Sequence, residues 1–309
     1  MTVFTRSKMT ALLKPKVNKV TGEYPQTPSE WKGYFHESES KMAYERMVQT
    51  RRFSYGAMKD EGGQFKSATG AGQTYETTFK NQEFGLTFAI TRTAVADNLY
   101  AREFNLGVSD LMDAMHNLKN LIAASYIING FPAGTIGVSS SVLADGKTLF
   151  APDHPIADNK SFSNFVDAGL NETSLEAAKL VLQKMKNEAG VFCPVDPEAL
   201  HITPDLEWTA ERLMKSQLRP GTANNDTNTI PGFLSKLVVN KWLSSTDLKP
   251  WFITSSVNKK GNSLVLFQRE KMQNSITIDP STWNIITTVF ERYCLGAHDP
   301  RGVVGGYNR

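Results

Sequence analysis

The stretch from residue 52 to residue 131 constrains the fold most, because it predicts a long β-hairpin that leads directly into a long helix. The outgoing strand is expected to start near Phe53 and Tyr55. The return strand alternates apolar and polar residues from Tyr75 to Ile90, which is the period of a strand. Between them lies a glycine-rich tip: Gly62, Gly63, Gly70 and Gly72.

A two-stranded ribbon of this kind is marginal alone in water, because it cannot bury its own apolar face. With about 20 residues on each side, at roughly 3.3 Å per residue, it could reach on the order of 60 Å. That reach exceeds the radius of one domain. We therefore expect the hairpin to lie on another copy of the molecule, which favours assembly over catalysis.

The first 51 residues are expected to form an arm that has aromatic anchors but no core of its own. Residues 42–48 are spaced like a short amphipathic turn. The arm should pack on the body of the chain or on a neighbouring copy. Contacts between copies are accordingly predicted at the tip, the return strand and the arm: Gly62, Gly63, Phe65, Gly70, Gly72, Tyr75, Phe79, Trp31 and Phe35.

A long helix is expected after the hairpin, beginning at Thr91 or Thr93 and ending near Asn129. At 1.5 Å per residue it would be a rod of roughly 50 Å. Its apolar residues recur at steps of three and four, which makes one stripe that we expect to be core: Phe104, Val108, Leu111, Met115, Leu118 and Ile122.

The rest of the chain mixes shorter helices and strands, so the predicted class is α+β. Helices are expected near residues 173–187 and 205–216. Strands are expected near residues 199–202, 237–239, 251–253, 264–267 and 283–293.

Composition is ordinary for a soluble protein and excludes several classes. The 309 residues carry a net charge of +3, from 34 basic and 31 acidic residues, which is too balanced for a dedicated nucleic-acid binder. Two cysteines do not make a disulfide framework, and we expect both to be reduced thiols. No run approaches the roughly 18 apolar residues of a membrane span. We expect no membrane contact and a chain that is cytosolic when made.

A search for catalytic motifs predicts no active site, cofactor or metal. The glycine-rich SATGAGQT at residues 67–74 lacks the lysine of a phosphate-binding loop. His154, with Asp153 and Asp158, could be a metal or acid–base cluster, but a hydrogen-bonded turn explains the same residues. Cys193 has no neighbours that mark a nucleophile. An enzyme remains an alternative, because catalytic groups can come from distant positions.

Four patches together carry a resemblance to a known family. They are ADNLYAREF (96–104), INGF (128–131), ADGKTLFAPDHP (144–155) and LHITPDLEWTAERLMKS (200–216). In this combination, and in the order of its elements, the chain resembles the Hong Kong 97-like major capsid proteins of tailed phages. Within that group it is most similar to the phage Mu-like major head subunit.

The resemblance implies a division of the chain into five parts. These are an N-terminal arm (1–51), an extended loop (52–92), a peripheral domain with a spine helix (93–171), an axial domain (172–275), and return strands with a C-terminal tail (276–309). It implies a structural protein that forms pentamers and hexamers and closes an icosahedral head around double-stranded DNA.

The implied partners are many copies of itself, portal and scaffolding or protease proteins, and packaged DNA bound without sequence preference. The implied location is the virion capsid, assembled in the bacterial cytoplasm. The basic residues that precede the first acidic residue, Glu23, could face the DNA, although a solvated, flexible terminus is the favoured explanation: Arg6, Lys8, Lys14, Lys16 and Lys19. Two alternatives stay open, an encapsulin-like compartment and an enzyme whose lid is the hairpin.

Overall fold

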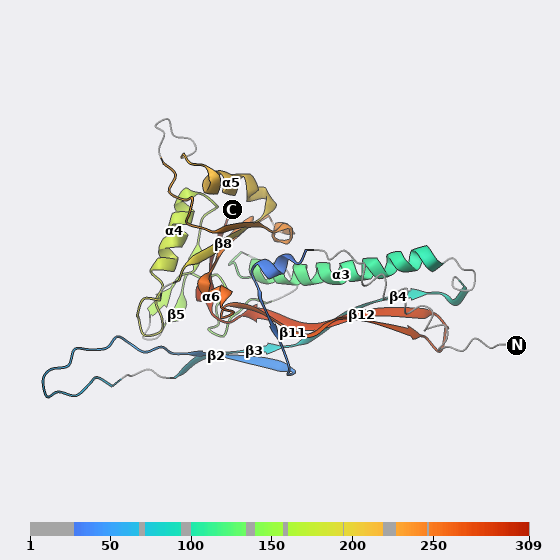
Figure 1. The fold of residues 1–309 in the computed structure, drawn as a ribbon, viewed down its shortest axis with the longest axis horizontal. Helices are drawn as coiled ribbons and strands as arrows, with labels where there is room; N and C mark the ends of the chain where they lie inside the picture. Colours follow the sequence, from blue (N-terminus) through green and yellow to red (C-terminus); the bar gives the residue numbers. More distant parts are fainter. Residues whose placement is uncertain are drawn as a thin grey trace.

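The structure is a computed structural model of the chain. We describe residues 28–67, 72–93, 100–133, 140–156, 160–193, 195–218, 227–245 and 247–308, and only the backbone of residues 100–107, 160 and 245. Figure 1 shows an elongated layer made of a long helix on a sheet, a second domain above one end of it, and a hairpin that extends beyond that end.

The elongated layer consists of a four-stranded sheet in the order β1-β11-β12-β4, with helix α3 lying along it (Figure 1). Its elements are β1 (His36–Glu39), β4 (Gln82–Ile90), α3 (Tyr100–Ile128), β11 (Leu264–Ile278) and β12 (Ile285–Ala297). β1 runs parallel to β11, and the other two pairs are antiparallel.

The predicted apolar stripe holds α3 to this sheet. Leu111 and Met115 are buried and cluster with Val289 of β12. Further along the helix, Ile122 and Tyr126 enter the main core. The prediction that the stripe is core is confirmed for its described members, except that Leu118 is only partly buried.

The second domain is a five-stranded sheet in the order β7-β13-β10-β8-β9, with helices packed on one face. Its elements are β7 (Phe165–Val166), α4 (Glu172–Gln183), β8 (Pro197–Ile202), α5 (Glu207–Lys215), β9 (Lys236–Val239), β10 (Pro250–Ser255) and β13 (Val303–Tyr307). Small hairpin strands and short helices complete the fold: β5 (His154–Ile156), β6 (Lys160–Phe162), η1 (Glu30–Gly33), η2 (Pro204–Leu206), η3 (Lys241–Ser245), α6 (Ser256–Lys259) and η4 (Pro300–Gly302).

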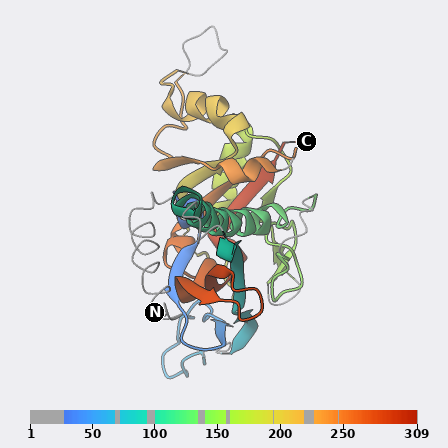
Figure 2. The ribbon, with the colours of Figure 1, turned by 90° about the vertical axis from the view of Figure 1, so that its right-hand side faces the viewer.

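Alternation along β10 divides the interior into two cores. Trp251 and Ile253 pack with the helices α4 and α5, whereas Phe252, between them, faces the core that α3 closes. This is the period of two expected of a strand that is buried on both faces. Viewed from the end of α3, the helix lies between the five-stranded domain and the four-stranded sheet (Figure 2).

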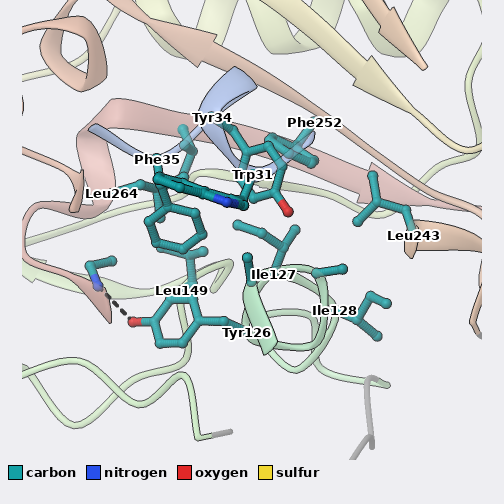
Figure 3. Packing of buried hydrophobic residues seen from close by; sticks show 14 of the residues in the cluster. Trp31, Tyr34, Phe35, Tyr126, Ile127, Ile128, Leu149, Leu243, Phe252 and Leu264 are labelled. Atoms are coloured by element: carbon teal, nitrogen blue, oxygen red, sulfur yellow. Dashed lines mark hydrogen bonds between the residues drawn. The ribbon is translucent and has the colours of Figure 1, made fainter. Parts of the chain in front are cut away.

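The core beneath α3 joins the segment around η1 to the long helix and to strands of both large sheets. Trp31 and Phe35, from the segment around η1, pack there with Tyr126 and Ile127 of α3 (Figure 3). The Tyr126 hydroxyl accepts a hydrogen bond of 2.8 Å from the backbone N–H of Ala297. The segment around η1 is therefore part of the subunit core.

The hairpin differs from the prediction at its outgoing strand. That strand is β2 (Tyr44–Thr50), which pairs with β3 (Gln73–Lys80). It does not begin near Phe53, and residues 44–48 are strand where we expected a helical turn. The reason is that Met47, facing inward, joins Phe79 and Phe267 in a small cluster at the hairpin base. After Asn81 the chain continues as β4, which leaves the hairpin and joins the four-stranded sheet.

The two sheets also divide the chain differently from the predicted domain bounds. Most of β11 lies in the predicted axial domain (172–275), but the strand belongs to the four-stranded sheet. β13 lies in the predicted tail (276–309) but belongs to the five-stranded sheet. The chain crosses between the sheets three times: between β4 and β7, before β11 and after β12. Sequence order alone could not reveal these crossings.

Candidate assembly surfaces

The outer half of the hairpin exposes a set of large apolar side chains. Beyond the β2–β3 ladder, residues 51–67 form a single turn and no strand or helix. Met58 is 100% exposed and Phe65 is 81% exposed, and Phe53 and Tyr55 are also exposed. Lys59 lies over the Phe65 ring at 4.6 Å. Exposed clusters of this kind mark interaction sites, because soluble monomers rarely leave them in water.

The predicted contact residues of the tip are placed on this exposed surface. Gly62, Gly63, Phe65 and Gly72 are all exposed. Gly62 has a φ of +78°, a left-handed conformation that favours glycine and that turns the chain at the tip. Tyr75 is half-buried on β3, and Gly70 lies outside the described residues.

Three of the predicted contacts are instead core residues of their own subunit. Trp31, Phe35 and Phe79 are buried at 3%, 4% and 5% exposure. Trp31 and Phe35 lie in the core beneath α3, and the Phe79 ring packs on Phe267 with 5.3 Å between centroids. The prediction of contacts between copies at these side chains was wrong, because the subunit itself already covers them.

A buried polar cluster fixes the base of the hairpin to the body. Gln49 of β2 donates from Nε2 to Glu188 Oε1 over 2.7 Å. The same oxygen accepts from Arg301 Nη2 at 2.7 Å, and Arg301 also makes paired bonds with Asp299. Burial acts to lower the pKa of Arg301, but Asp299 and Glu188 outweigh it and hold that pKa above its usual range. Glu188, which follows α4 in the five-stranded domain, thus bonds both to β2 of the hairpin and to Arg301 in the segment between β12 and β13.

Two further side chains, Asn81 and Thr77, hold the inner half of the hairpin. Asn81, between β3 and β4, donates from Nδ2 to Ser40 Oγ at 2.8 Å and to the Met42 carbonyl at 2.9 Å. Thr77 Oγ1 lies 3.1 Å from His298 Nδ1. The hairpin is therefore anchored along its base. In the described part of its outer half, the Phe192 N–H donates to the Tyr55 hydroxyl over 3.4 Å. Sequence reasoning missed these anchors, because no local motif connects such distant positions.

Replacing Glu188 by alanine is expected to loosen the hairpin base. Gln49 would lose its partner and Arg301 would keep only Asp299, which should cost about 2 kcal/mol for the unsatisfied buried groups. Amide hydrogen exchange should accelerate in β2 and β3 more than in α3. Exchange followed by mass spectrometry measures both.

Glu198→Ala is the matched control, because Glu198 pairs with Lys259 at a more exposed site. Exposed pairs contribute at most about 1 kcal/mol, so hairpin exchange should stay at the level of the unmodified protein. Equal exchange in the hairpin of both variants would show that Glu188 does not anchor it.

The candidate catalytic residues form structural contacts. His154 is buried, with Nδ1 2.7 Å from Asp145 Oδ2 and Nε2 3.3 Å from the Leu149 carbonyl. Asp153 pairs with Lys147, and Asp158 lies outside the described residues. Burial raises the pKa of Cys294 to about 12, which keeps it a thiol. The expected role of His154 in a hydrogen-bonded turn is thus confirmed.

The described part of the chain contains no candidate metal site and no candidate membrane-spanning helix. No three potential ligands there converge on one point. None of the helices described there is long and apolar enough to cross a membrane. The basic residues Arg6, Lys8, Lys14, Lys16 and Lys19 precede residue 28 and lie outside the described residues.

Comparison with known proteins decides the family. A family model described as phage capsid protein matches residues 74–305, which is most of the chain. The chain belongs to the phage capsid protein family. Its function is therefore structural, and the expectation that it is not an enzyme is confirmed. No curated protein matches the sequence.

Solved structures share the fold of this capsid protein at low sequence identity. The capsid of a native GTA particle, computed with C5 symmetry, has a TM-score of 0.57 at 10% identity, covering 92% of this chain and 94% of that one. A structure from Microbacterium phage Oxtober96 has a TM-score of 0.55 at 10% identity, covering 92% of each chain. One from Mycobacterium phage Patience has a TM-score of 0.54 at 11% identity, covering 97% and 88%. The α+β class is confirmed.

Proposed function

We propose that this protein is the major capsid protein of a tailed phage, with the Hong Kong 97-like fold and closest to the Mu-like head subunit. Many copies assemble into pentamers and hexamers, which close an icosahedral head around double-stranded DNA. The observation that carries the proposal is the hairpin: its base is fixed by buried bonds, while its outer half extends with Met58 and Phe65 exposed.

Each part of the subunit has a place in this proposal. The hairpin, residues 41–81, is the extended loop that lies over an adjacent copy. The four-stranded sheet and α3 form the peripheral domain, and the five-stranded sheet with α4 and α5 forms the axial domain that meets its symmetry mates. The exposed Trp208 of α5 and the exposed Trp283 at the β11–β12 turn lie in these two domains. Both are candidates for contacts between copies.

The partners follow from the same proposal. The basic residues of the arm (Arg6, Lys8, Lys14, Lys16 and Lys19) face the lumen and contact DNA phosphates without reading sequence. Portal and scaffolding or protease proteins take part in assembly, which occurs in the bacterial cytoplasm. The head itself is the final location.

Negative-stain electron microscopy of the expressed protein tests the proposed function. Closed shells tens of nanometres across are expected, and a population of monomers alone, at concentrations that support assembly, would contradict it. Nucleic acid measured in particles from phage-infected cells separates the two shell functions. DNA-filled particles support the phage head, and particles that enclose an enzyme would instead indicate an encapsulin-like compartment.

A further inference from the structure

A groove opens where β4 ends its pairing with β12. The register between these strands runs from Ile285 opposite Ile90 to Tyr293 opposite Gln82. β12 continues beyond this point to Ala297, while the chain that precedes Gln82 turns away into the hairpin. A space of about 390 Å³ remains beside the end of β12, between the base of the hairpin and helix α3.

The groove combines apolar walls with a polar rim. α3 contributes Leu118 and Tyr126, and β12 contributes Leu295. Leu118 and Leu295 are only partly buried within their own subunit. Two exposed polar residues of the hairpin base, Thr78 and Lys80, complete the lining. An apolar centre inside a polar rim is the usual arrangement of a protein interface. The groove therefore suits a peptide segment that has an apolar side chain between polar neighbours.

The outer half of the hairpin carries a segment of that kind. Phe65 is 81% exposed, and Gln64 and Lys66 flank it in the sequence. Lys59 Nζ lies 4.6 Å from the centroid of the Phe65 ring, so a positive charge accompanies the ring. Aromatic side chains that become buried between proteins contribute strongly to binding. Phe65 therefore has the chemistry of an anchor residue at an interface.

Phe65 cannot reach the groove of its own subunit. The groove is lined at Thr78, whereas Phe65 lies beyond the other end of β3, past Gly72. At roughly 3.3 Å per residue, the strand between Gly72 and Thr78 alone spans about 20 Å. The outer half of the hairpin also extends beyond the body (Figure 1). A second copy is thus the chain that can bring Phe65 to the groove.

A carboxylate beside the groove matches the lysines beside Phe65. Burial, and next the charge of Glu45, raise the pKa of Cys294, which lines the groove. Glu45 Oε1 accepts a hydrogen bond of 2.9 Å from Ser40 Oγ, which lowers the pKa of Glu45 and keeps the carboxylate charged. Lys59 and Lys66 accompany Phe65 on the hairpin. Opposite charges at the two sites favour their contact.

We propose that this groove receives Phe65 from the hairpin of a second copy. The inference rests on the proposed function and deepens it, because it names the surface that the hairpin covers. The protrusion and the groove are different surfaces of one chain, so the contact is head-to-tail. Each copy gives its hairpin to one neighbour and receives the hairpin of another. Contacts of this type close into rings when the rotation between copies permits.

Photochemical cross-linking in shells assembled from mixed light and heavy isotope-labelled subunits tests the contact. The variant Phe65→p-benzoylphenylalanine places a photoreactive ring at the protrusion. After irradiation, mass spectrometry should find mixed light–heavy peptides that join position 65 to the segments 78–84, 118–126 or 293–295. Phe53→p-benzoylphenylalanine is the matched control, because Phe53 is another exposed aromatic residue of the hairpin. It should label other segments.

Thr78→Trp tests the same contact without a photoreactive group, because the new ring fills the groove from an exposed position of its rim. The thermal midpoint of this variant should match that of the unmodified subunit, whereas closed shells should be lost. Thr87→Trp is the control. It adds the same ring at an exposed position of β4 outside the groove, and it should form shells normally.

The outcomes separate this contact from the proposed function. Light–heavy labels in the groove, with loss of shells from Thr78→Trp but not from Thr87→Trp, would support the contact. Shells from Thr78→Trp at the normal yield would overturn it, as would labels from position 65 that are confined to other surfaces. Either result would leave the proposed function standing, since shells had formed. Failure of the unmodified protein to form shells would overturn both.

Discussion

A variant that lacks the outer half of the hairpin should fold normally and fail to form shells. In this variant an Asn-Gly turn replaces residues 52–71, just beyond the bond from the Arg51 N–H to the Gly72 carbonyl. Asn-Gly suits a two-residue hairpin turn. The thermal midpoint should stay close to that of the full chain, because the described part of the removed segment is exposed and makes few contacts with the body. Assembly should be lost, because the deletion removes the exposed apolar side chains that a neighbouring copy would cover in the shell.

Thermal melting and sedimentation followed by microscopy measure these two effects separately. Glu61→Gln, in the same turn, is the control and should assemble as the full chain does. A gentler variant, Met58→Ser with Phe65→Ser, should lower the yield of shells without changing the melt. Normal yields of closed shells from the deletion variant would contradict the role proposed for the hairpin.

An aspartate at position 111 should prevent the subunit from folding. Leu111 is buried between α3 and Val289 of β12, and an uncompensated buried charge costs about 3–5 kcal/mol. The lost apolar contact adds to this, and typical domains have only about 5–15 kcal/mol of stability in total. The variant should therefore appear as aggregated or unfolded chain in circular dichroism and size-exclusion experiments.

Asn117→Asp, a half-exposed position on the same helix, provides the control for helix propensity and added charge. It should fold and assemble. A soluble Leu111→Asp protein that still assembles would show that the stripe does not face the core.

Regular periodicity made the spine helix and most strands predictable. The stripe of α3 and the apolar runs at 199–202, 251–253 and 283–293 correspond to described elements. β11 was predicted only from 264 to 267, because its second half is polar. It is a strand there because it pairs with β12 as far as Ile278. Tertiary pairing, which a local pattern does not contain, extended it.

The incorrect predictions for residues of the arm and the hairpin have the same physical cause. The spacing of residues 42–48 fits a helical turn as well as a strand, and the pairing of β2 with β3 decided between them. Trp31 and Phe35 looked like free anchors, because their core partners come from α3 and from strands more than 200 residues away. A local sequence window cannot show such partners.

The buried polar clusters differ in how far the sequence could have predicted them. Gln49, Glu188 and Arg301 left no signal in the sequence. Lys119 did leave one, because it stands beside Leu118 of the predicted apolar stripe, four residues after Met115 and three before Ile122. It is buried on α3, with its Nζ 2.5 Å from Gln268 Oε1 and 2.6 Å from Glu291 Oε1. A charge at a core position calls for a buried partner. That rule could have singled out Lys119, although it could not have named Gln268 or Glu291.

Cross-linking of shells assembled from mixed light and heavy isotope-labelled subunits tests the central claim most directly. A lysine-reactive cross-linker should join Lys59 and Lys66 of the hairpin to lysines of the body. If the hairpin lies on a neighbouring copy, these peptides should contain mixed light–heavy pairs. Hairpin cross-links found only within one isotope label would place the hairpin on its own subunit and contradict the account.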